Sequence, residues 1–246
     1  MVKNGRTHIE SLRDGRRIFI DGESVVDHTQ HPAFRHAVAT AASLYEYQAQ
    51  PENLDTMTFV SPTSGDRVSR IWQLPTSLAE LVERRRVLER WAELTCGMLG
   101  RSPDHVASCI SGMYMGLDLF ERHSPARASA VREYFSTRAI SDLYLTYVII
   151  NPQADRSKDA SQQSDEFLVA GVCDEDREGI TIRGAKMLGT RLSAGQRSIR
   201  RRDSAAQAGR GEVQRHRDGA AQREGAARFS RASRSRRTPS RCSTTR

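Results

Sequence analysis

Three polar side chains in this sequence are each of a type that can bind an oxygen atom that carries or develops negative charge. Arg101 and His105 lie four residues apart in the segment GRSPDH, and Tyr147 lies in the later segment LYLTYVIINP. An arginine keeps its positive charge and can stabilise an oxyanion, while imidazole and phenol groups donate or accept hydrogen bonds. Each residue also has a purely structural interpretation. Arg101 fits a surface position before a proline-started helix, His105 a surface position on that helix, and Tyr147 a core position on an apolar helix face.

The segment NPQADRSK, at residues 151–158, is the second candidate. The residue before a proline is biased away from the helical conformation, so Asn151-Pro152 predicts that the preceding helix ends there. Arg156 and the exposed backbone N–H groups after this turn suit a pyrophosphate group, because both donate hydrogen bonds to anions. The alternative interpretation is a polar linker between two domains.

The elements that must position these residues are predicted to be mainly helical up to residue 150. Thr7 is expected to cap a short helix that ends at Gly15, and Asp21-Gly22 predicts a β-hairpin. Further helices are predicted at 31–50, 77–100, 103–122 and 126–149, and pairs of short strands at 56–74 and 166–190. The residues expected to face the core are Phe34, Val38, Ala41 and Tyr45 on the first of these helices and Leu78, Leu81, Val82, Leu88, Trp91 and Leu94 on the second.

This order of elements predicts an α+β protein whose character changes near residue 151. A chain of 246 residues is long enough for one large domain or two smaller ones. We expect a mainly α-helical domain at 1–150, the truncated start of a β domain at 151–190, and a disordered tail rich in arginine and serine at 191–246.

The formal net charge of +8 would by itself suggest a nucleic-acid or acidic-membrane partner. The charge is unevenly distributed, however. Residues 191–246 carry 16 arginines, no lysine and 4 acidic side chains, a net +12, whereas residues 1–190 carry 22 basic and 26 acidic side chains, a net −4. The body of the protein is therefore mildly acidic, and only the tail is basic.

The four cysteines show neither a CxxC motif nor the spacing of Cys/His metal ligands, so we expect buried free thiols and no metal site. They are Cys96, Cys109, Cys173 and Cys242. No apolar run approaches the roughly 18 residues of a membrane span, and the N-terminus lacks a signal-peptide core. A cytoplasmic location is therefore expected.

The tail has three interpretations: a nucleic-acid-binding arm, a solvated disordered end, or the product of a changed reading frame. A base-stacking arm is disfavoured because the tail has one Phe and no Tyr or Trp. One possible coding of AGQRSIRR, residues 194–201, gives the apolar sequence LANEVFVG when it is translated one base later. We therefore hypothesise that the reading frame is lost between Thr190 and Ala194, and that the tail is not a domain.

Four stretches, in the same order along the chain, resemble the flavin-dependent 4-hydroxyphenylacetate 3-monooxygenase family, the large oxygenase component of two-component phenol hydroxylases. They are SLRDGRRIFIDGESVVDHTQHPAFR at 11–35, GMLGRSPDH at 97–105, LYLTYVIINPQADRSK at 143–158 and GITIRGAKMLGT at 179–190. The resemblance implies an acyl-CoA-dehydrogenase-like fold with an α domain, a middle β domain and a C-terminal helical bundle. Because the bundle has no counterpart in this sequence, we expect the chain as it stands to be inactive.

The resemblance also implies a reaction. Family members take reduced FAD from a separate reductase, use it to activate O2, and hydroxylate a phenol ortho to its hydroxyl group; intact members are homo-oligomers. Arg101 matches the family's substrate-side arginine. His105 and Tyr147 stand where the best-known members carry a tyrosine and a histidine, respectively, and both can still hydrogen-bond a phenol. The resemblance implies a phenolic substrate such as 4-hydroxyphenylacetate, and this exchange leaves open a different phenol. The residues implied as flavin contacts are Gln153, Ala154, Asp155, Arg156 and Thr190.

Two other functions remain open. A flavoprotein like 4-hydroxybutyryl-CoA dehydratase shares the fold but needs an iron–sulfur cluster, and Cys96 and Cys109 lack a matching set of further ligands. A nucleic-acid-binding protein would act through the arginines of the tail, with an affinity that depends on salt.

Overall fold

The computed structural model describes residues 2–152, 155, 157–158, 162–164, 168–176, 179–187, 189, 193–195 and 197–200. The chain divides into two compact units. Of these described residues, the first unit draws on those within 2–13, 32–147 and 193–199, and the second on those within 14–31 and 148–189 together with residue 200.

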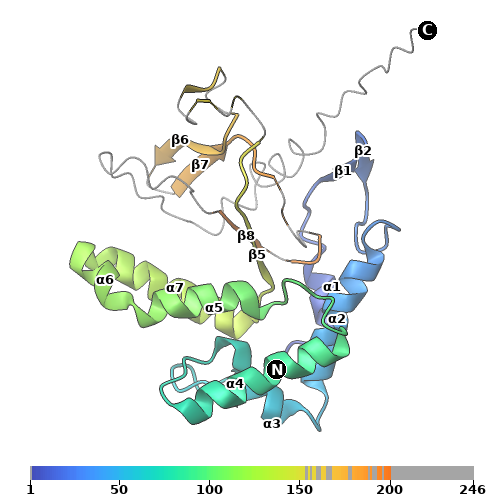
Figure 1. Ribbon diagram of the computed structural model, residues 1–246, viewed down its shortest axis with the longest axis vertical. Helices are drawn as coiled ribbons and strands as arrows, with labels where there is room; N and C mark the ends of the chain where they lie inside the picture. The colour runs from blue at the N-terminus through green and yellow to red at the C-terminus, as the bar shows by residue number, and fades with distance from the viewer. Residues whose placement is uncertain are drawn as a thin grey trace. The chain divides into compact units, whose positions relative to one another are not determined.

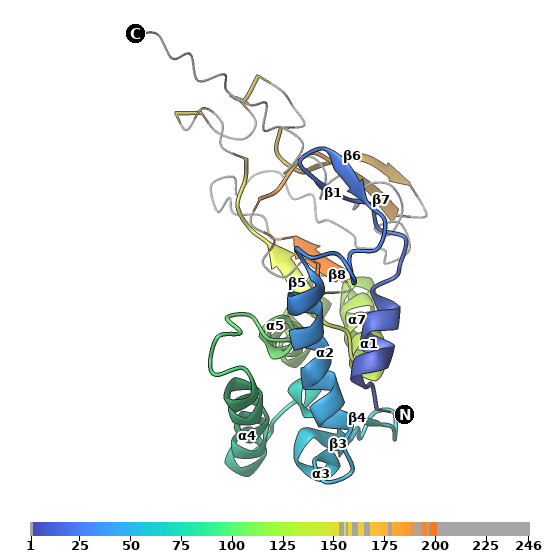
Figure 2. The ribbon, with the colours of Figure 1, turned by 90° about the vertical axis from the view of Figure 1, so that its right-hand side faces the viewer.

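The helices of the first unit are α1 (Gly5–Ser11), α2 (Arg35–Ala49), α3 (Leu54–Met57), α4 (Leu78–Leu94), α5 (Asp104–Met115), α6 (Leu117–His123) and α7 (Pro125–Ser141), with a 3₁₀ turn η1 at Arg70–Trp72 (Figure 1). Two pairs of strands belong to this unit. β3 (Thr58–Val60) pairs antiparallel with β4 (Arg67–Ser69), and β5 (Leu145–Val148) pairs with β8 (Arg197–Arg200), as Figure 2 shows. No helix in the described part of the chain is long and apolar enough to cross a membrane.

The first helix begins earlier than the sequence suggests. Asn4, not Thr7, is its N-cap: the Asn4 side chain accepts a hydrogen bond from the Thr7 amide at 2.9 Å, and the Thr7 hydroxyl accepts one from the Asn4 amide at 3.0 Å. This reciprocal pair is a capping box, which satisfies two backbone donors at once. The helix ends at Ser11 with Leu12 as its C-cap, so the prediction that it continues to Gly15 is wrong.

The helix predicted at 126–149 is also wrong in its second half. It ends at Ser141, because Asp142 takes the left-handed conformation, with φ 42° and ψ 57°. The residues that follow, LYLTYVII, are β-branched, aromatic or leucine, and such residues favour strands. They form β5, so Tyr147 lies on a strand and not on a helix. The helix predicted at 103–122 is likewise divided, since Gly116 leaves the helical conformation between α5 and α6.

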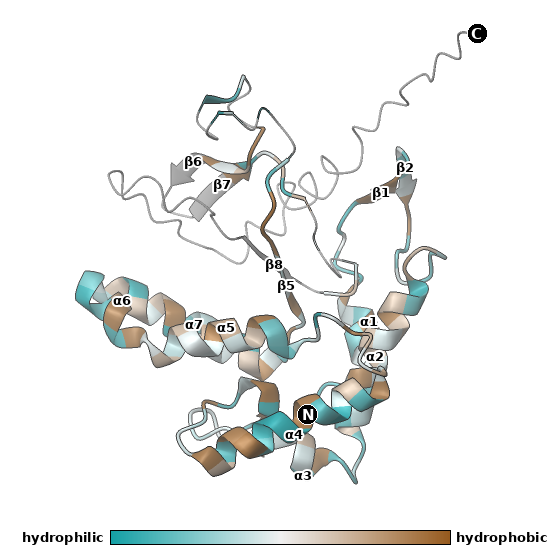
Figure 3. Ribbon diagram, in the orientation of Figure 1, coloured by the Kyte–Doolittle hydropathy of each residue, from teal (hydrophilic) through white to brown (hydrophobic). Residues whose placement is uncertain are grey.

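The core of the first unit lies where α2, η1, α4, α5, α7 and β5 meet. Its buried members are Leu44, Met57, Ile71, Trp72, Val87, Trp91, Val106, Ala107, Ile110, Phe135, Ala139 and Leu145. The predicted inner face of α2 is confirmed, because all four of its residues are buried. The predicted face of α4 is half wrong. Leu78, Leu81 and Leu94 are exposed, but Trp91 is buried and Val82 and Leu88 are partly buried; Val87, which was not predicted, is also buried. Apolar and polar bands alternate along α4 (Figure 3).

The second unit contains two antiparallel hairpins. The first pairs β1 (Ile18–Ile20) with β2 (Glu23–Val25), and its turn residues Asp21 and Gly22 both have positive φ, as a two-residue hairpin requires. The second pairs β6 (Gly171–Asp176) with β7 (Gly179–Arg183) and carries a register shift between Val172 and Asp174. Both hairpins were predicted from the sequence, and both are confirmed.

The prediction of buried thiols is wrong for the two cysteines whose surroundings the structure describes. Cys96 and Cys109 are free and exposed. Cys96 lies at the loosely wound end of α4, and Cys109 lies on the outer side of α5, so neither packs into the core.

Candidate active site

Arg101, His105 and Tyr147 come together in the first unit, although 42 residues separate the last two. Nη1 of Arg101 lies 3.3 Å from Nε2 of His105, and the same nitrogen of His105 lies 3.0 Å from the Tyr147 hydroxyl. The two rings stack with centroids 5.2 Å apart, and the Arg101 guanidinium lies over the Tyr147 ring at 4.5 Å from its centroid. The three side chains therefore form one polar cluster.

Each member of the cluster comes from a different local structure. Arg101 lies in the loop between α4 and α5, His105 lies in the first turn of α5, and Tyr147 lies on β5. Asp104 is the first residue of α5, after Pro103 at the N-cap, and its carboxylate accepts a hydrogen bond from the Ser102 hydroxyl. His105 is exposed, whereas Arg101 and Tyr147 are partly buried, so the cluster is open to an approaching molecule.

The geometry around His105 gives the cluster its chemical capacity. A neutral imidazole nitrogen has one lone pair, and two donors, the Arg101 guanidinium and the Tyr147 hydroxyl, lie within reach of Nε2. A ligand oxygen placed between them could accept a hydrogen bond from Arg101 and exchange a proton with His105. The cluster is thus suited to bind an acidic hydroxyl group and to stabilise its anion.

A residue that the sequence analysis did not single out, Tyr144, connects this cluster to the core. Its side chain is 1% exposed, and its hydroxyl donates a hydrogen bond to the backbone carbonyl of Arg101. The signal for it was present in the sequence, because Tyr144 and Tyr147 belong to the same β-prone segment; the incorrect helix assignment hid it.

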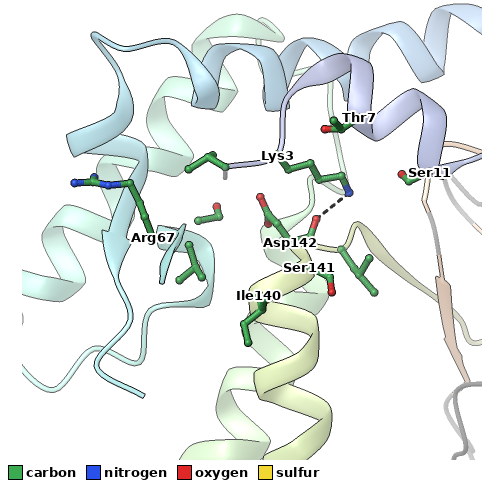
Figure 4. Close-up of a pocket in the computed structure, with 11 residues that line it drawn as sticks. Lys3, Thr7, Ser11, Arg67, Ile140, Ser141 and Asp142 are labelled. Atoms are coloured by element: carbon green, nitrogen blue, oxygen red, sulfur yellow. Dashed lines mark hydrogen bonds between the residues drawn. The ribbon is translucent and has the colours of Figure 1, made fainter. Parts of the chain in front are cut away.

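A network of buried polar groups supports the start of that segment. The Asp142 carboxylate accepts hydrogen bonds from Gln48 Nε2 at 2.7 Å and from Trp72 Nε1 at 3.2 Å, and the Ser69 hydroxyl donates to Gln48 Oε1 at 2.6 Å. Lys3 Nζ donates to the Asp142 backbone carbonyl at 3.0 Å (Figure 4). Burial raises the pKa of Asp142, and it lowers the pKa of Lys3 to about 8 even though Asp142 acts in the opposite direction.

The Lys3 and Asp142 groups line a pocket of about 380 Å³, together with residues from α1, β4 and the end of α7. Thr7, Ser11, Arg67 and Ile140 also line it (Figure 4). The pocket does not include any member of the Arg101 cluster.

The segment after β5 belongs to the second unit and is held by Lys186. Lys186 Nζ donates to the Ile149 carbonyl at 2.9 Å and to Asn151 Oδ1 at 2.6 Å. The Met187 amide also donates to the Ile150 carbonyl at 2.8 Å. This lysine lies in the GAKMLGT segment, so two stretches that are far apart in sequence fix the start of the predicted flavin loop.

Of the five predicted flavin contacts, the structure describes Asp155. Its carboxylate accepts hydrogen bonds from the Ser157 hydroxyl at 2.6 Å and the Ser157 amide at 3.0 Å, and it forms an ion pair with Lys158 at 3.4 Å. The Ser157 hydrogen bonds lower the pKa of Asp155. Gln153, Ala154, Arg156 and Thr190 lie outside the described residues. No group of three or more potential metal-ligating side chains occurs among the residues that the structure describes.

The fold is that of acyl-CoA-dehydrogenase-like flavoproteins, as comparison with solved structures shows. The oxygenase component of 4-hydroxyphenylacetate 3-monooxygenase, solved in complex with FAD and 4-hydroxyphenylacetate, superimposes with a TM-score of 0.69 at 32% identity, over 75% of this chain and 38% of that chain. An archaeal 4-hydroxybutyryl-CoA dehydratase from N. maritimus superimposes with a TM-score of 0.63 at 22% identity. The second likeness shows a shared fold and no more.

Sequence comparison defines the family. The model of the 4-hydroxyphenylacetate 3-hydroxylase N-terminal region matches residues 4–197. The chain is 34% identical over 190 residues to the 4-hydroxyphenylacetate 3-monooxygenase oxygenase component of Geobacillus sp. (strain PA-9), and 36% identical over 191 residues to the pyoverdin chromophore biosynthetic protein PvcC of Pseudomonas aeruginosa. These alignments cover 77% of this chain but 38% and 36% of the relatives. The chain therefore belongs to the 4-hydroxyphenylacetate 3-hydroxylase family of enzymes, and the sequence-based assignment is confirmed.

Proposed function

We propose that this chain provides the phenol-binding residues of an FADH2-dependent aromatic monooxygenase that hydroxylates its substrate ortho to an existing hydroxyl group. The observation that carries the proposal is the convergence of Arg101, His105 and Tyr147 on one point, with Nε2 of His105 within 3.3 Å of the arginine and 3.0 Å of the tyrosine. A cation beside two hydrogen-bonding groups suits a phenol that ionises during the reaction.

Each side chain has a separate role in this proposal. Arg101 holds the phenol oxygen and stabilises the phenolate, which makes the ring a better nucleophile at the ortho carbon. His105 takes the phenol proton, because its ring nitrogen can act as an acceptor. Tyr147 supports Arg101 through its ring face, and its hydroxyl oxygen accepts a hydrogen bond from Nε2 of His105 once that nitrogen carries the proton.

The segment at 151–158 is the proposed flavin loop, with Gln153, Ala154, Asp155, Arg156 and Thr190 as its contacts. Reduced FAD, when bound, supplies the electrons that activate O2. The described residues fit an anionic cofactor because the Asp155 carboxylate is already engaged by Ser157 and Lys158, so its charge is partly compensated within the loop. Its proposed role is to shape the loop, which leaves backbone N–H groups and Arg156 for the pyrophosphate.

The substrate is proposed to be a phenol such as 4-hydroxyphenylacetate or a close relative of it. His105 and Tyr147 exchange the tyrosine and histidine of the best-known family members, and the hydrogen bond between them in this structure supports an exchange that preserves the pair. A related protein from Rhodococcus sp., 34% identical over 187 residues, is named 4-nitrophenol 2-monooxygenase, oxygenase component. Phenols of several kinds are thus accommodated in the family.

The remaining parts of the proposal concern partners and location. A separate reductase supplies FADH2, the whole protein forms homo-oligomers, and the reaction takes place in the cytoplasm. We also propose 1–150 as an α domain, 151–190 as the start of the middle β domain and 191–246 as an out-of-frame tail. The family match ends at residue 197, so the greater part of the tail, 198–246, has no counterpart in the family model.

Binding to the purified 246-residue chain tests the role of the cluster. We expect calorimetry to detect binding of 4-hydroxyphenylacetate to the chain. Phenylacetate, which lacks the hydroxyl group, should bind with a dissociation constant about tenfold higher. Arg101→Gln should weaken phenol binding about ten- to a hundredfold, the loss expected for a charged hydrogen bond. Arg122→Gln is the matched control, because Arg122 lies on the exposed surface of α6 in an ion pair with Asp118. Equal binding of the two ligands would refute the proposal.

Resequencing of the gene from codon 180 onward tests the reading frame. A single-base change that opens a continuous frame through LANEVFVG should also restore hydroxylation in the presence of FADH2. The chain as written is expected to lack that activity, and substrate-dependent product formed by it would contradict this expectation.

A further inference from the structure

The backbone carbonyl of Arg101 accepts a hydrogen bond from a residue that is distant in sequence, Tyr144. The loop between α4 and α5 follows two residues with positive φ, Cys96 and Gly97, and regular hydrogen bonding resumes with α5. Within the described part of the chain, the backbone of 99–101 receives one hydrogen bond from another element, and its donor is the Tyr144 hydroxyl. Among the described residues, the hydrogen bond from another element to this backbone therefore comes from Tyr144, in the segment that leads into β5.

The same short segment also holds the other end of Arg101. Tyr147 lies three residues after Tyr144, and its ring lies under the Arg101 guanidinium at 4.5 Å. Tyr144 thus binds the backbone carbonyl of Arg101 through a hydrogen bond, while the ring of Tyr147 contacts its guanidinium group. Because both tyrosines belong to residues 144–147, the position of the cation is set by one rigid piece of chain.

That piece of chain is anchored firmly in the core. Tyr144 packs in a buried cluster with Ala41, Tyr45 and Ala194, and its ring lies 6.2 Å from that of His8. Two residues earlier, the Asp142 carboxylate is bound by Gln48 and Trp72. A hydroxyl mounted on so rigid a base can position a loop without contacting the ligand itself.

We propose that Tyr144 is a positioning residue: its hydroxyl holds the backbone of Arg101 so that the guanidinium lies against Tyr147 and His105, ready for an acidic hydroxyl group. The proposal rests on the proposed function for the role of the cluster. The position of the Arg101 side chain can be measured without any ligand. The positioning role of Tyr144 and the phenol-binding function of the cluster can therefore fail separately.

The test compares two tyrosine-to-phenylalanine variants of the same buried cluster. Tyr144→Phe removes the hydroxyl that donates to Arg101 and keeps the ring. Tyr45→Phe is the matched control, because the Tyr45 side chain is fully buried and its hydroxyl has no hydrogen-bond partner among the described residues. Both substitutions delete one oxygen from one cluster, so a general loss of packing would affect both.

The first readout is the NMR shift of the Arg101 side-chain protons, which the ring current of Tyr147 displaces when the guanidinium lies over the ring. We expect this displacement in the wild type and in Tyr45→Phe, and its loss in Tyr144→Phe, together with faster hydrogen exchange of the amides at 99–102. The second readout is calorimetry with 4-hydroxyphenylacetate, whose dissociation constant should rise about fivefold in Tyr144→Phe, the effect of one hydrogen bond.

An unchanged Arg101 shift and unchanged exchange in Tyr144→Phe would overturn the proposal, whatever the calorimetry gives. If the wild type does not bind phenols, that result counts against the proposed function. The NMR result would still decide whether Tyr144 positions Arg101. If Tyr144→Phe does not fold, the wild type decides: a slowly exchanging Tyr144 hydroxyl proton with a cross-peak to the Arg101 region supports the proposal, and a freely exchanging one contradicts it.

Discussion

Replacement of Asp142 by alanine should destabilise the first unit more than the loss of any surface charge. Asp142 is 5% exposed, and its carboxylate accepts hydrogen bonds from two fully buried partners, Gln48 and Trp72. Removing the acceptor leaves both donors unsatisfied, at about 1–3 kcal/mol each. Alanine at φ 42° adds about 1–2 kcal/mol, because the left-handed conformation is unfavourable for it.

The net effect is smaller than this sum, because the wild-type protein carries the cost of burying a carboxylate. That cost is visible in the raised pKa of Asp142. We therefore expect the free energy of unfolding to fall by about 2–4 kcal/mol. With a denaturant slope of about 1–3 kcal/mol per molar urea, the urea midpoint should fall by about 0.7–4 M.

Urea titration followed by tryptophan fluorescence measures this change. The chain has two tryptophans, Trp72 and Trp91, and both are buried in the core of the first unit. Asp118→Ala is the matched control, since Asp118 lies on the surface of α6 and its ion pair with Arg122 is exposed. Its free energy of unfolding should stay within about 0.5 kcal/mol of the wild type. If Asp142→Ala and Asp118→Ala unfold at the same urea concentration, the reasoning about the buried network is wrong.

Two further predictions concern pH and backbone conformation. Burial lowers the pKa of Lys3 to about 8, whereas a lysine in the unfolded chain titrates near 10.4. Between these two pH values the unfolded state binds more protons than the folded state. The free energy of unfolding should therefore rise between pH 8 and about 10.4. Lys3→Met should remove that rise, and urea midpoints at pH 7 and 9.5 for both chains test it. In the second unit, Gly184 has φ 114°, and a Cβ there would lie 2.4 Å from the Val169 carbonyl oxygen. Gly184→Ala should therefore accelerate amide exchange throughout β6 and β7, whereas Gly65→Ala, at φ 74° with open space around it, should cost about 1–2 kcal/mol and leave this hairpin unchanged.

The local features of the chain could be predicted from sequence because short-range rules govern them. Asp21-Gly22 supplies the two positive-φ residues of a hairpin turn, and the inner face of α2 follows from the helical spacing of its apolar residues. Family membership was also accessible, because the segments around Arg101 and Tyr147 occur together and in order. In each of these cases the information lies within one segment or in the order of segments.

The end of α7 could not be predicted from short-range rules. Local pattern alone left the segment up to Ile149 helical, but the structure ends the helix at Ser141. Asp142 can take a left-handed conformation there because Gln48 and Trp72, distant in sequence, satisfy its buried carboxylate. The exposed leucines of α4 have the same origin, since the face that a helix buries depends on which elements pack against it.

By itself, the sequence determined the residue types that could do chemistry, the hairpin turns and the family. Only the tertiary structure decided that Arg101, His105 and Tyr147 meet, because His105 on α5 reaches Tyr147 on β5, a strand that the sequence analysis assigned to a helix. It also decided the role of Tyr144, whose hydroxyl reaches a carbonyl 43 residues away in the chain. Contacts of this kind depend on packing between distant segments, and no local pattern encodes the distance between them.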